Sequence, residues 1–250
     1  MRIAALYDIH GNLPALEAVL ADVRDAAVDL VVMGGDVLPG PMPHESLAAL
    51  AALAALADDG VALLAIRGNG DRTVLEARRG TISPEVPAPI HDVMRWNAAQ
   101  LTPHDAAWME GWPTTATVEH DALGRILFCH ATPRSDTEIF TQRTAEARIA
   151  PAFDGVDAAL VVCGHTHMTF DRTIAGRRVV NAGSVGMPFG ETGARWLLID
   201  RDVEFRHTTY DLDAAAARIR TTAYPRAEHF AAHNVLTTPT AEAMLAALER

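Results

Sequence analysis

RIAALYDIHGN, residues 2–12, is the stretch from which the fold can be read. Its apolar run over residues 2–7 predicts a buried strand, and polar side chains follow at once. Asn12 is a suitable N-cap for a helix expected over residues 13–27, with Pro14 in the first turn. Apolar residues recur along that helix at Leu16, Val19, Leu20 and Val23. The chain therefore opens with a strand that runs directly into a helix.

The same alternation continues to residue 66. Apolar runs at residues 29–33 and 61–66 predict two more strands, and residues 44–57 predict a helix with a leucine at every third position from Leu47 to Leu56. A βαβαβ order favours parallel neighbours in a sheet covered by helices. The longest apolar run, residues 47–57, is too short to span a membrane, so no membrane association is expected.

Residues 80–113 interrupt this rhythm. They predict a loop, a helix over 91–100 and a second helix capped by Thr102. Trp96, Trp108 and Trp112 all fall here, and we expect them to pack the insertion onto the core. The alternative is a platform on which a nucleobase stacks.

The later part of the chain predicts antiparallel pairing. Three hairpins are expected, at residues 114–119 with 125–129, 169–174 with 178–180, and 195–199 with 203–208, beside a strongly apolar strand at 158–163. We expect one domain over residues 1–210 that includes the insertion at about 80–113. The alanine-rich helices of residues 211–250 are expected to pack on that domain, with a dimer contact or a lid over the site as alternatives.

Composition narrows the functional classes. The 250 residues carry a net charge of −11, which disfavours stable binding to nucleic acid. Every basic residue is arginine, so Schiff-base chemistry on lysine and a P-loop lysine are excluded. Cys129 and Cys163 lie in apolar runs and predict no disulfide framework. Because no disulfide framework is implied, a reducing cytoplasm is the expected location. The N-terminal run becomes polar too soon for a signal peptide.

Five apolar runs end in side chains of the kinds that bind metals. These ends are Asp8-Ile9-His10, Gly34-Gly35-Asp36, Gly68-Asn69-Gly70-Asp71, Cys129-His130 and Gly164-His165-Thr166-His167. Sites in open α/β sheets form outside the carboxyl ends of the strands, so the five ends can converge. Carboxylate, imidazole and amide oxygen suit manganese, iron and zinc. Asp8 and His10, like His165 and His167, are two apart, and in a strand-like segment such pairs face the same way.

Each of these ends has an ordinary explanation when taken alone. Gly-Asp and Gly-Asn-Gly-Asp are common turns, and a single histidine such as His130 is more often a buried, hydrogen-bonded core residue. All five ends together, in order and each directly after a strand, are hard to explain by turns.

The five motifs, in this order, resemble the calcineurin-like metallophosphoesterase superfamily over about residues 1–200. The small single-domain phosphodiesterase branch is the most similar. The resemblance implies an α/β fold, a calcineurin-like β-sandwich of mixed sheets flanked by helices in four αββα layers. It also implies a pair of divalent ions as cofactors. Manganese is expected first, with iron, zinc or nickel as alternatives. The nucleophile of the family is a water or hydroxide shared by both ions.

Carried over motif by motif, the resemblance also assigns residues. Asp8, His10 and His167 would hold one ion, Asn69, His130 and His165 the other, and Asp36 would bridge them. Asp36, Asn69 and His130 are the residues expected at the catalytic centre. The residues expected to contact a small phosphorylated substrate are Asn12, Arg67, Asn69, Arg72 and Arg134. For each arginine, an exposed side chain or a surface ion pair is at least an equal alternative.

The chain departs from the family pattern at two places. Many members have a histidine, thought to protonate the leaving group, where this chain has Gly70. We therefore expect a preference for activated diesters or phosphoanhydrides over simple alkyl monoesters. His44, His91 and His104 are candidates to replace the missing acid. Asp36 is followed by Val37-Leu38-Pro39, not by the Asp-Arg-Gly of the protein phosphatases, which argues against that class.

The sequence thus predicts a metal-dependent phosphoesterase that cleaves phosphodiester or phosphoanhydride bonds of nucleotide-type substrates. Two other classes stay open. One is a non-catalytic scaffold that binds protein partners, and the other is a sensor that holds a nucleotide without turnover.

Overall fold

The computed structural model of the chain describes residues 1–55, 61–84 and 86–249. One five-stranded sheet has the order β10-β9-β1-β2-β3. Strands β1 (Ile3–Leu6), β2 (Leu30–Met33) and β3 (Ala62–Ala65) are parallel, and β9 (Ala194–Ile199) and β10 (Val203–Thr208) extend the sheet antiparallel beyond β1. The predicted parallel βαβαβ unit is confirmed. Leu56 and Ala57 of the predicted second helix lie outside the described residues.

The second five-stranded sheet has the order β4-β5-β6-β8-β7. Here β5 (Gly124–Cys129), β6 (Leu160–Cys163) and β8 (Arg177–Ala182) are parallel, while β4 (Thr115–His120) and β7 (Thr169–Ile174) are the antiparallel edge strands. All three predicted hairpins are present: β4 with β5, β7 with β8, and β9 with β10.

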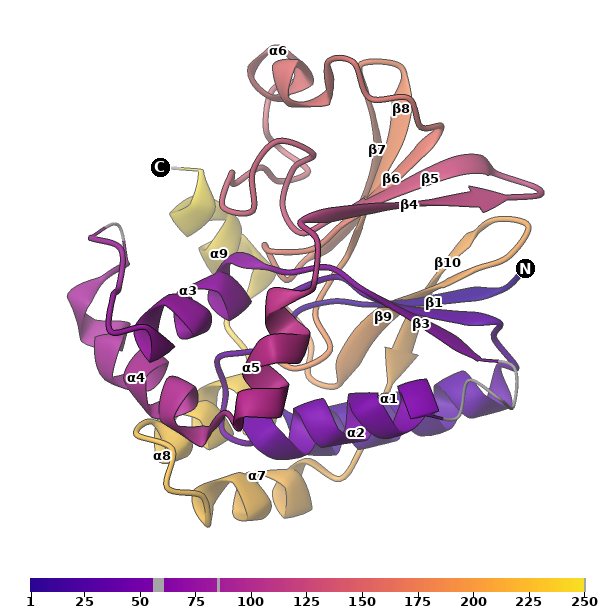
Figure 1. Ribbon diagram of the computed structural model, residues 1–250. Coiled ribbons are helices and arrows are strands. Elements are labelled where there is room, and N and C mark those ends of the chain that lie inside the picture. The colour runs from indigo at the N-terminus through magenta and orange to yellow at the C-terminus, as the bar shows by residue number, and fades with distance from the viewer. Residues whose placement is uncertain (56–60, 85, 250) are drawn as a thin grey trace.

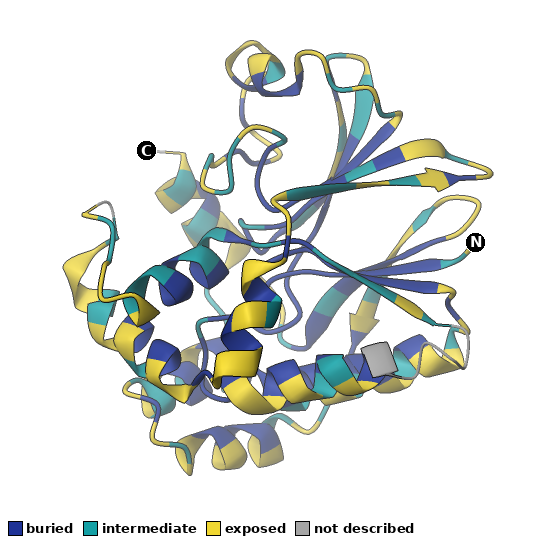
Figure 2. Cartoon of the chain, viewed as in Figure 1, coloured by how far each residue is buried: buried dark blue, intermediate teal, exposed yellow. Residues whose placement is uncertain are grey.

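The two sheets pack face to face, as Figure 1 shows. Side chains alternate between the faces of β1, so Ile3, Ala5 and Tyr7 point to the second sheet and contact the cluster that holds Phe128 and Val162. The Tyr7 hydroxyl donates to the carbonyl of Val162 at 2.9 Å, which ties the two sheets together. The core between the sheets is almost entirely apolar. Figure 2 shows the inner strands, such as β1, β2 and β6, as buried, whereas the edge strands β4 and β10 are partly exposed.

Helices cover the outer face of the first sheet. Helices α1 (Leu13–Asp25) and α2 (Pro43–Ala55) pack on the other face of β1 and β2, in one cluster with Leu6 and Val31. The second sheet has a thinner cover, made of α6 (Glu146–Ile149), the 3-10 turn Ala150–Phe153 and the loop around Phe140. The predicted sandwich of mixed sheets flanked by helices is confirmed, with one outer layer much thicker than the other.

One helix that was not predicted precedes the insertion. Helix α3 (Asn69–Arg78) starts inside the Gly-Asn-Gly-Asp motif, which sequence reasoning had treated as a turn. The predicted helices follow as α4 (His91–Gln100) and α5 (Pro103–Glu110), after a 3-10 turn at Ala88–Ile90. Thr102 caps α5 by accepting from Asp105 N at 3.1 Å, as predicted.

The C-terminal residues form α7 (Leu212–Arg220), α8 (Ala227–Phe230), a π-helix over Ala231–Leu236 and α9 (Ala241–Leu248). Trp96 of the insertion meets Tyr224 edge to face, with 5.4 Å between ring centroids, so the C-terminal segment packs against the insertion. Trp108 and Trp112 meet in the same way at 5.2 Å. Among the described residues, no helix is long and apolar enough to cross a membrane.

Candidate metal centre

The five polar ends follow β1, β2, β3, β5 and β6, and their side chains converge at one edge of the sandwich. The backbone there is left-handed rather than extended, with φ of 53° at Asp8, 47° at His10, 52° at Asp36, 68° at His165 and 58° at His167. The alternation of side chains along a strand therefore does not explain why the side chains of Asp8 and His10 lie together, so that part of the prediction was wrong. Tight left-handed turns, uncommon outside glycine, aim these side chains instead.

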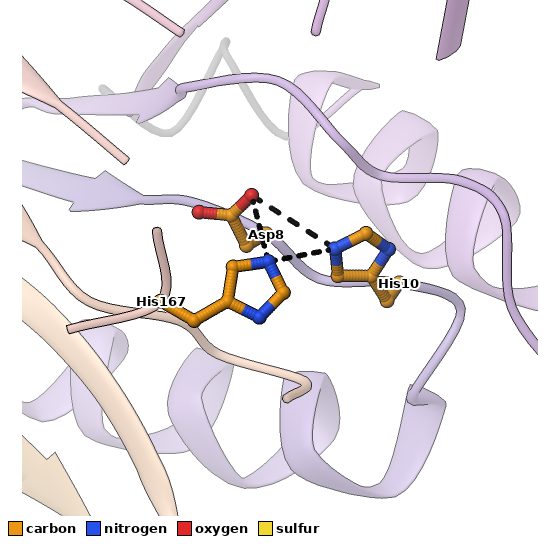
Figure 3. A group of neighbouring side chains, drawn as sticks. All are labelled: Asp8, His10 and His167. Carbon is orange, nitrogen blue, oxygen red and sulfur yellow. Dashed lines mark hydrogen bonds and ion pairs between the residues drawn. The ribbon is translucent and has the colours of Figure 1, made fainter. Parts of the chain in front are cut away.

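Asp8, His10 and His167 form one compact group, drawn in Figure 3. The Nε2 atoms of the two histidines lie 3.1 Å apart, and Asp8 Oδ1 is 3.9 Å from His10 Nε2 and 3.4 Å from His167 Nε2. Each ring turns its Nδ1 to a backbone carbonyl, Pro39 O at 3.2 Å and Met187 O at 2.8 Å. Those nitrogens must donate, so both Nε2 atoms of the neutral rings carry lone pairs. A proton or a metal ion is needed between them.

Asp8, Asp36 and His130 form a second group that shares Asp8 with the first. His130 Nε2 is 3.5 Å from Asp36 Oδ2 and 3.9 Å from Asp8 Oδ1, while its Nδ1 donates to Gly34 O at 3.0 Å. Burial lowers the pKa of His130, but the adjacent Asp36 outweighs burial and raises it to about 10. Burial raises the pKa of Asp36, and His130 lowers it by more. In the metal-free protein, His130 therefore carries a proton, and its positive charge lies beside the Asp36 carboxylate.

Asn69 and His165 complete the second group. The Asn69 amide oxygen faces His130 Nε2, His165 Nδ1 and the carbonyl of Asp136. The carbonyl only accepts, and each ring nitrogen accepts whenever it carries no proton. Turning the amide would let its nitrogen donate to them at 3.1, 3.0 and 3.0 Å. The observed orientation suits an amide oxygen that binds a cation. The rings of His130 and His165 meet edge to face at 5.1 Å.

The carboxylates are held so that one oxygen of each faces the histidines. Asp8 Oδ2 accepts from His165 N at 2.9 Å, and Asp36 Oδ1 accepts from Gly70 N at 2.7 Å. Asp8 Oδ1 is buried and receives no hydrogen bond. A fully buried carboxylate oxygen without a donor is costly unless a cation satisfies it. The donor set and this orphaned oxygen fit divalent metal ions, and the carbonyl acceptors behind the rings are what metal-binding histidines use.

Both carboxylates lie between the two groups. Asp8 Oδ1 belongs to each group, and Asp36 Oδ2 is 3.8 Å from His10 Nε2 as well as 3.5 Å from His130 Nε2. A bridging role for Asp36 is compatible with this geometry and stays a prediction, and Asp8 is an equal candidate on distance alone.

Gly70 sits where a side chain has no room. A Cβ there would lie 2.3 Å from Leu38 O and 2.9 Å from Pro39 Cδ. The neighbouring Asp71 is buried and accepts from Asp36 N, Leu38 N and Gly68 N at 2.8, 2.9 and 3.0 Å. The loop after β2 therefore occupies the place that a histidine at position 70 would need, and Asp71 fastens it there.

A polar cavity of about 320 Å³ lies on the His130 side of the site. Arg72 and Arg134 line it, together with Thr132 and Ser135. Arg72 is paired with Asp136, at 2.7 Å from Nε to Oδ2, and Arg134 is paired with Glu138. Both arginines thus stand beside the site with carboxylate partners already in place.

A second cavity of about 330 Å³ opens on the other side, where His10, Asp36, Asn69 and Gly70 line it. Its remaining walls are mostly apolar. Pro39 and Met187 come from the loops after β2 and β8, and the others come from the insertion and the C-terminal segment: Ile90, Val93, Met94, Tyr224, Arg226, His229, Phe230 and Asn234. Sequence reasoning found no motif in the C-terminal segment and missed these residues. No local pattern in residues 211–250 marks them, because their role depends on where the segment packs.

Other predicted residues lie away from both cavities. Asn12 is fully buried and used internally: Oδ1 accepts from Ala15 N at 3.3 Å and Nδ2 donates to Gly186 O at 2.9 Å. Arg67 lines neither cavity, and its Nε is buried without a hydrogen bond. His44 pairs with Asp105 at 3.1 Å, His91 with Val86 O at 2.8 Å, and His104 is exposed. The structure brings none of these three histidines to either cavity.

Comparison with known proteins agrees with the fold and the order of motifs. A sequence profile of the calcineurin-like phosphoesterase superfamily domain matches residues 1–203. An uncharacterized protein of Methanocaldococcus jannaschii is 24% identical over 238 residues, which cover 87% of this chain and 91% of the relative.

Two crystal structures share the architecture. A hypothetical protein from Pyrococcus horikoshii OT3 aligns with a TM-score of 0.77 at 20% identity, over 92% of this chain and 97% of that one. A metallophosphoesterase from Sphaerobacter thermophilus aligns with a TM-score of 0.72 at 24% identity, over 95% and 98% of the two chains. At these identities the likeness concerns the fold.

Proposed function

Because the chain belongs to the calcineurin-like phosphoesterase superfamily, we propose that it hydrolyses phosphodiester or phosphoanhydride bonds of nucleotide-type substrates at a centre of two divalent metal ions. The observation that carries the proposal is the pair of ligand groups that meet at Asp8, with the Nε2 atoms of His10 and His167 only 3.1 Å apart. Such an arrangement of acceptors has no purpose without a cation.

The ligand assignment follows the two groups. Asp8, His10 and His167 would hold one ion, and Asn69, His130 and His165 the other, with Asp36 between them. When bound, two such ions lower the pKa of a water molecule and neutralise charge on the phosphoryl oxygens. Manganese suits this mixture of carboxylate, imidazole and amide oxygen, and iron, zinc or nickel are alternatives.

The chain's own residues would orient these groups. The carbonyls of Pro39, Met187 and Gly34 fix which ring nitrogen of each histidine faces the centre. Gly70 N, at the N-terminus of α3, holds the Asp36 carboxylate by a hydrogen bond of 2.7 Å. Arg72 and Arg134 line the polar cavity and could exchange a carboxylate partner for a phosphate oxygen.

The two cavities support a substrate with organic groups on both sides of the phosphorus. One cavity includes His130 and the other includes His10, Asp36 and Asn69, so they flank the same centre. A diester or a phosphoanhydride has two such arms, whereas a simple monoester has one. The natural partner is then a small phosphorylated molecule, and we place the reaction in the cytoplasm, where the buried thiols of Cys129 and Cys163 stay reduced.

The test is manganese-dependent hydrolysis of bis(p-nitrophenyl) phosphate, with Asp36→Asn measured alongside. We expect turnover that disappears in the variant while the folded far-UV spectrum is retained. Absence of turnover with manganese, iron, zinc and nickel would contradict the proposal. The protein would then be a non-catalytic scaffold or a nucleotide sensor, and a search for a protein partner would follow.

A further inference from the structure

We infer that the C-terminal segment supplies a recognition pocket for a nucleobase, in which the Asn234 side chain determines specificity. This inference rests on the proposed function, because it names what the organic arm of the phosphorylated substrate is. Asn234 lies in the π-helix Ala231–Leu236, beyond residues 1–203 that match the superfamily domain.

The first observation is an amide without a partner. Asn234 is only 9% exposed and lines the apolar cavity, yet none of the described residues forms a hydrogen bond with its side chain. The amide atoms of Asn234 are not among the fully buried unpaired atoms, so they are open to the cavity and free to pair with a ligand there. The buried Asn97 of α4 is the contrast, since it accepts from Gly40 N and donates to Val93 O, both at 3.0 Å.

The second observation is the local helix geometry. Residues 231–236 form a π-helix in direct continuation of α8. Such π-helical turns are rare and are frequently found at functional sites. Asn234 is the residue of this π-helix that lines the cavity, and its side chain is polar.

The third observation is the shape and chemistry of the walls. Ile90, Val93 and Met94 from the insertion and Tyr224 and Phe230 from the C-terminal segment make an apolar slot. Tyr224 is fixed between Trp96 at 5.4 Å and Phe230 at 6.1 Å, both edge to face. Arg226 also donates to the carbonyl of Pro89, so insertion and C-terminal segment are linked at two points. The slot is thus held open by packing on both sides.

These features match a nucleobase. The faces of a base are apolar and stack on such side chains, while its edge offers adjacent hydrogen-bond donors and acceptors. An asparagine amide carries one donor and one acceptor group and can pair with such an edge in two hydrogen bonds. A volume of about 330 Å³ is near the lower end for small-molecule sites, about 300–1,000 Å³, so it admits one nucleoside and not two.

The charged residues of the cavity and the position of the ligand groups suggest how a nucleotide would be oriented. Arg226 and the histidines His10 and His229 are the basic residues that line this cavity, and Asp36 is the acidic one. Asp36 lies at the end shared with His10 and Asn69. A nucleotide would therefore lie with its phosphate at the ligand groups and its base between the insertion and Asn234.

The test compares adenosine 5′-monophosphate with ribose 5-phosphate, which has the same phosphate and sugar but no base. Binding of each to the manganese-loaded protein is measured by calorimetry. We expect the wild type to bind adenosine 5′-monophosphate about tenfold or more tightly than ribose 5-phosphate. Asn234→Ala should remove about fivefold or more of that preference and leave the affinity for ribose 5-phosphate unchanged.

Two further variants separate recognition from folding. Asn234→Asp keeps the shape and removes the N–H donor, so it should also lose preference for the base. Asp213→Ala changes an exposed residue of α7, in the same C-terminal segment but outside the cavity, and should behave as wild type. Equal affinity of the wild type for both ligands, or equal weakening of both by Asn234→Ala, would overturn the inference.

Failure of the nucleobase pocket and failure of the proposed phosphoesterase activity would give different results. Turnover of bis(p-nitrophenyl) phosphate without any preference for the base would contradict the nucleobase pocket and support the phosphoesterase activity. A preference for the base without turnover of any ester or anhydride would support the nucleobase pocket and contradict the phosphoesterase activity.

Discussion

The Nε2 atoms of His10 and His167 face each other across 3.1 Å, although the two residues are 157 positions apart in the chain. Burial and His167 lower the pKa of His10. Burial also lowers the pKa of His167, but Asp8 outweighs it and raises it. In the metal-free protein one proton can therefore lie between the rings, and a metal ion would displace it.

Metal binding should stabilise the fold. At manganese about 100 times above its Kd, the free energy of unfolding should rise by about 2.7 kcal/mol, which is roughly 5–10 °C in melting temperature for a domain of this size. His167→Ala should lose most of that shift, because one ligand and the acceptor pair disappear. Differential scanning fluorimetry with manganese and with chelator measures it. His104→Ala, at an exposed position, is the control and should keep the full shift. An equal shift in both variants would place the metal elsewhere.

Gly70→Ala should destabilise the protein by roughly 1–3 kcal/mol, because the new Cβ would lie 2.3 Å from Leu38 O and the well-packed loop must move. The same movement disturbs Asp36, whose carboxylate accepts from Gly70 N, so turnover should fall as well. Guanidinium denaturation and steady-state kinetics measure the two effects. Gly111→Ala is the matched control, since Gly111 has φ of −75° and a nearest contact at 3.3 Å. A Gly70→Ala protein as stable as the wild type would show that the loop yields without cost.

The proposed phosphoesterase activity should depend strongly on the leaving group. No histidine can occupy position 70, so alkoxide leaving groups lack the proton donor that many family members have. General acid catalysis contributes on the order of 10²–10⁴-fold, and we expect kcat/KM for a phosphoanhydride or aryl diester to exceed that for glycerol phosphate by a factor in this range. A kinetic series over leaving groups of graded pKa checks this. A simple alkyl monoester that is cleaved faster than any anhydride would contradict it.

The metal-free protein should become less stable as pH rises from about 6.5 to about 10. His130 has a pKa raised to about 10 by Asp36, against 6.5 in the unfolded chain, so the folded state binds one more proton in this window. The contribution is fully present below pH 6.5, falls by at most about 1.4 kcal/mol per pH unit, and is gone above pH 10.

Denaturation of the protein in the presence of a chelator, at several pH values, measures how its free energy of unfolding changes with pH. His130→Gln should flatten this dependence, because the titrating group is removed. Saturation with manganese should also flatten it, because the ligands are then deprotonated at all these pH values. A slope that is the same in wild type and His130→Gln would assign the effect to other groups.

Local sequence patterns were sufficient for most of the architecture. Strand β1, helix α1 with its Asn12 cap, helix α4 at His91–Gln100 and all three hairpins lie within a few residues of their predicted bounds. These features depend on neighbours in the chain, through hydrophobic period and capping. The helices α3 and α6 were not predicted. Helix α3 starts at Asn69 in a motif that reads as a turn, where Gly68 N donates to Asp71 in a local capping bond and Gly70 N donates to the distant Asp36.

The sequence by itself determined the order of strands and helices and the polar residues at five strand ends, because each is encoded in a short stretch. The sandwich was expected from the family resemblance that those five ends carry. Only the tertiary structure decided how those residues are used. It aims Asp8 and His167 by left-handed turns, fills the space beside Gly70 with the Leu38 carbonyl, pairs Arg72 with Asp136, and brings Asn234 to the cavity. Contacts between distant segments leave no periodic trace in either segment, so they become visible only when the chain has folded.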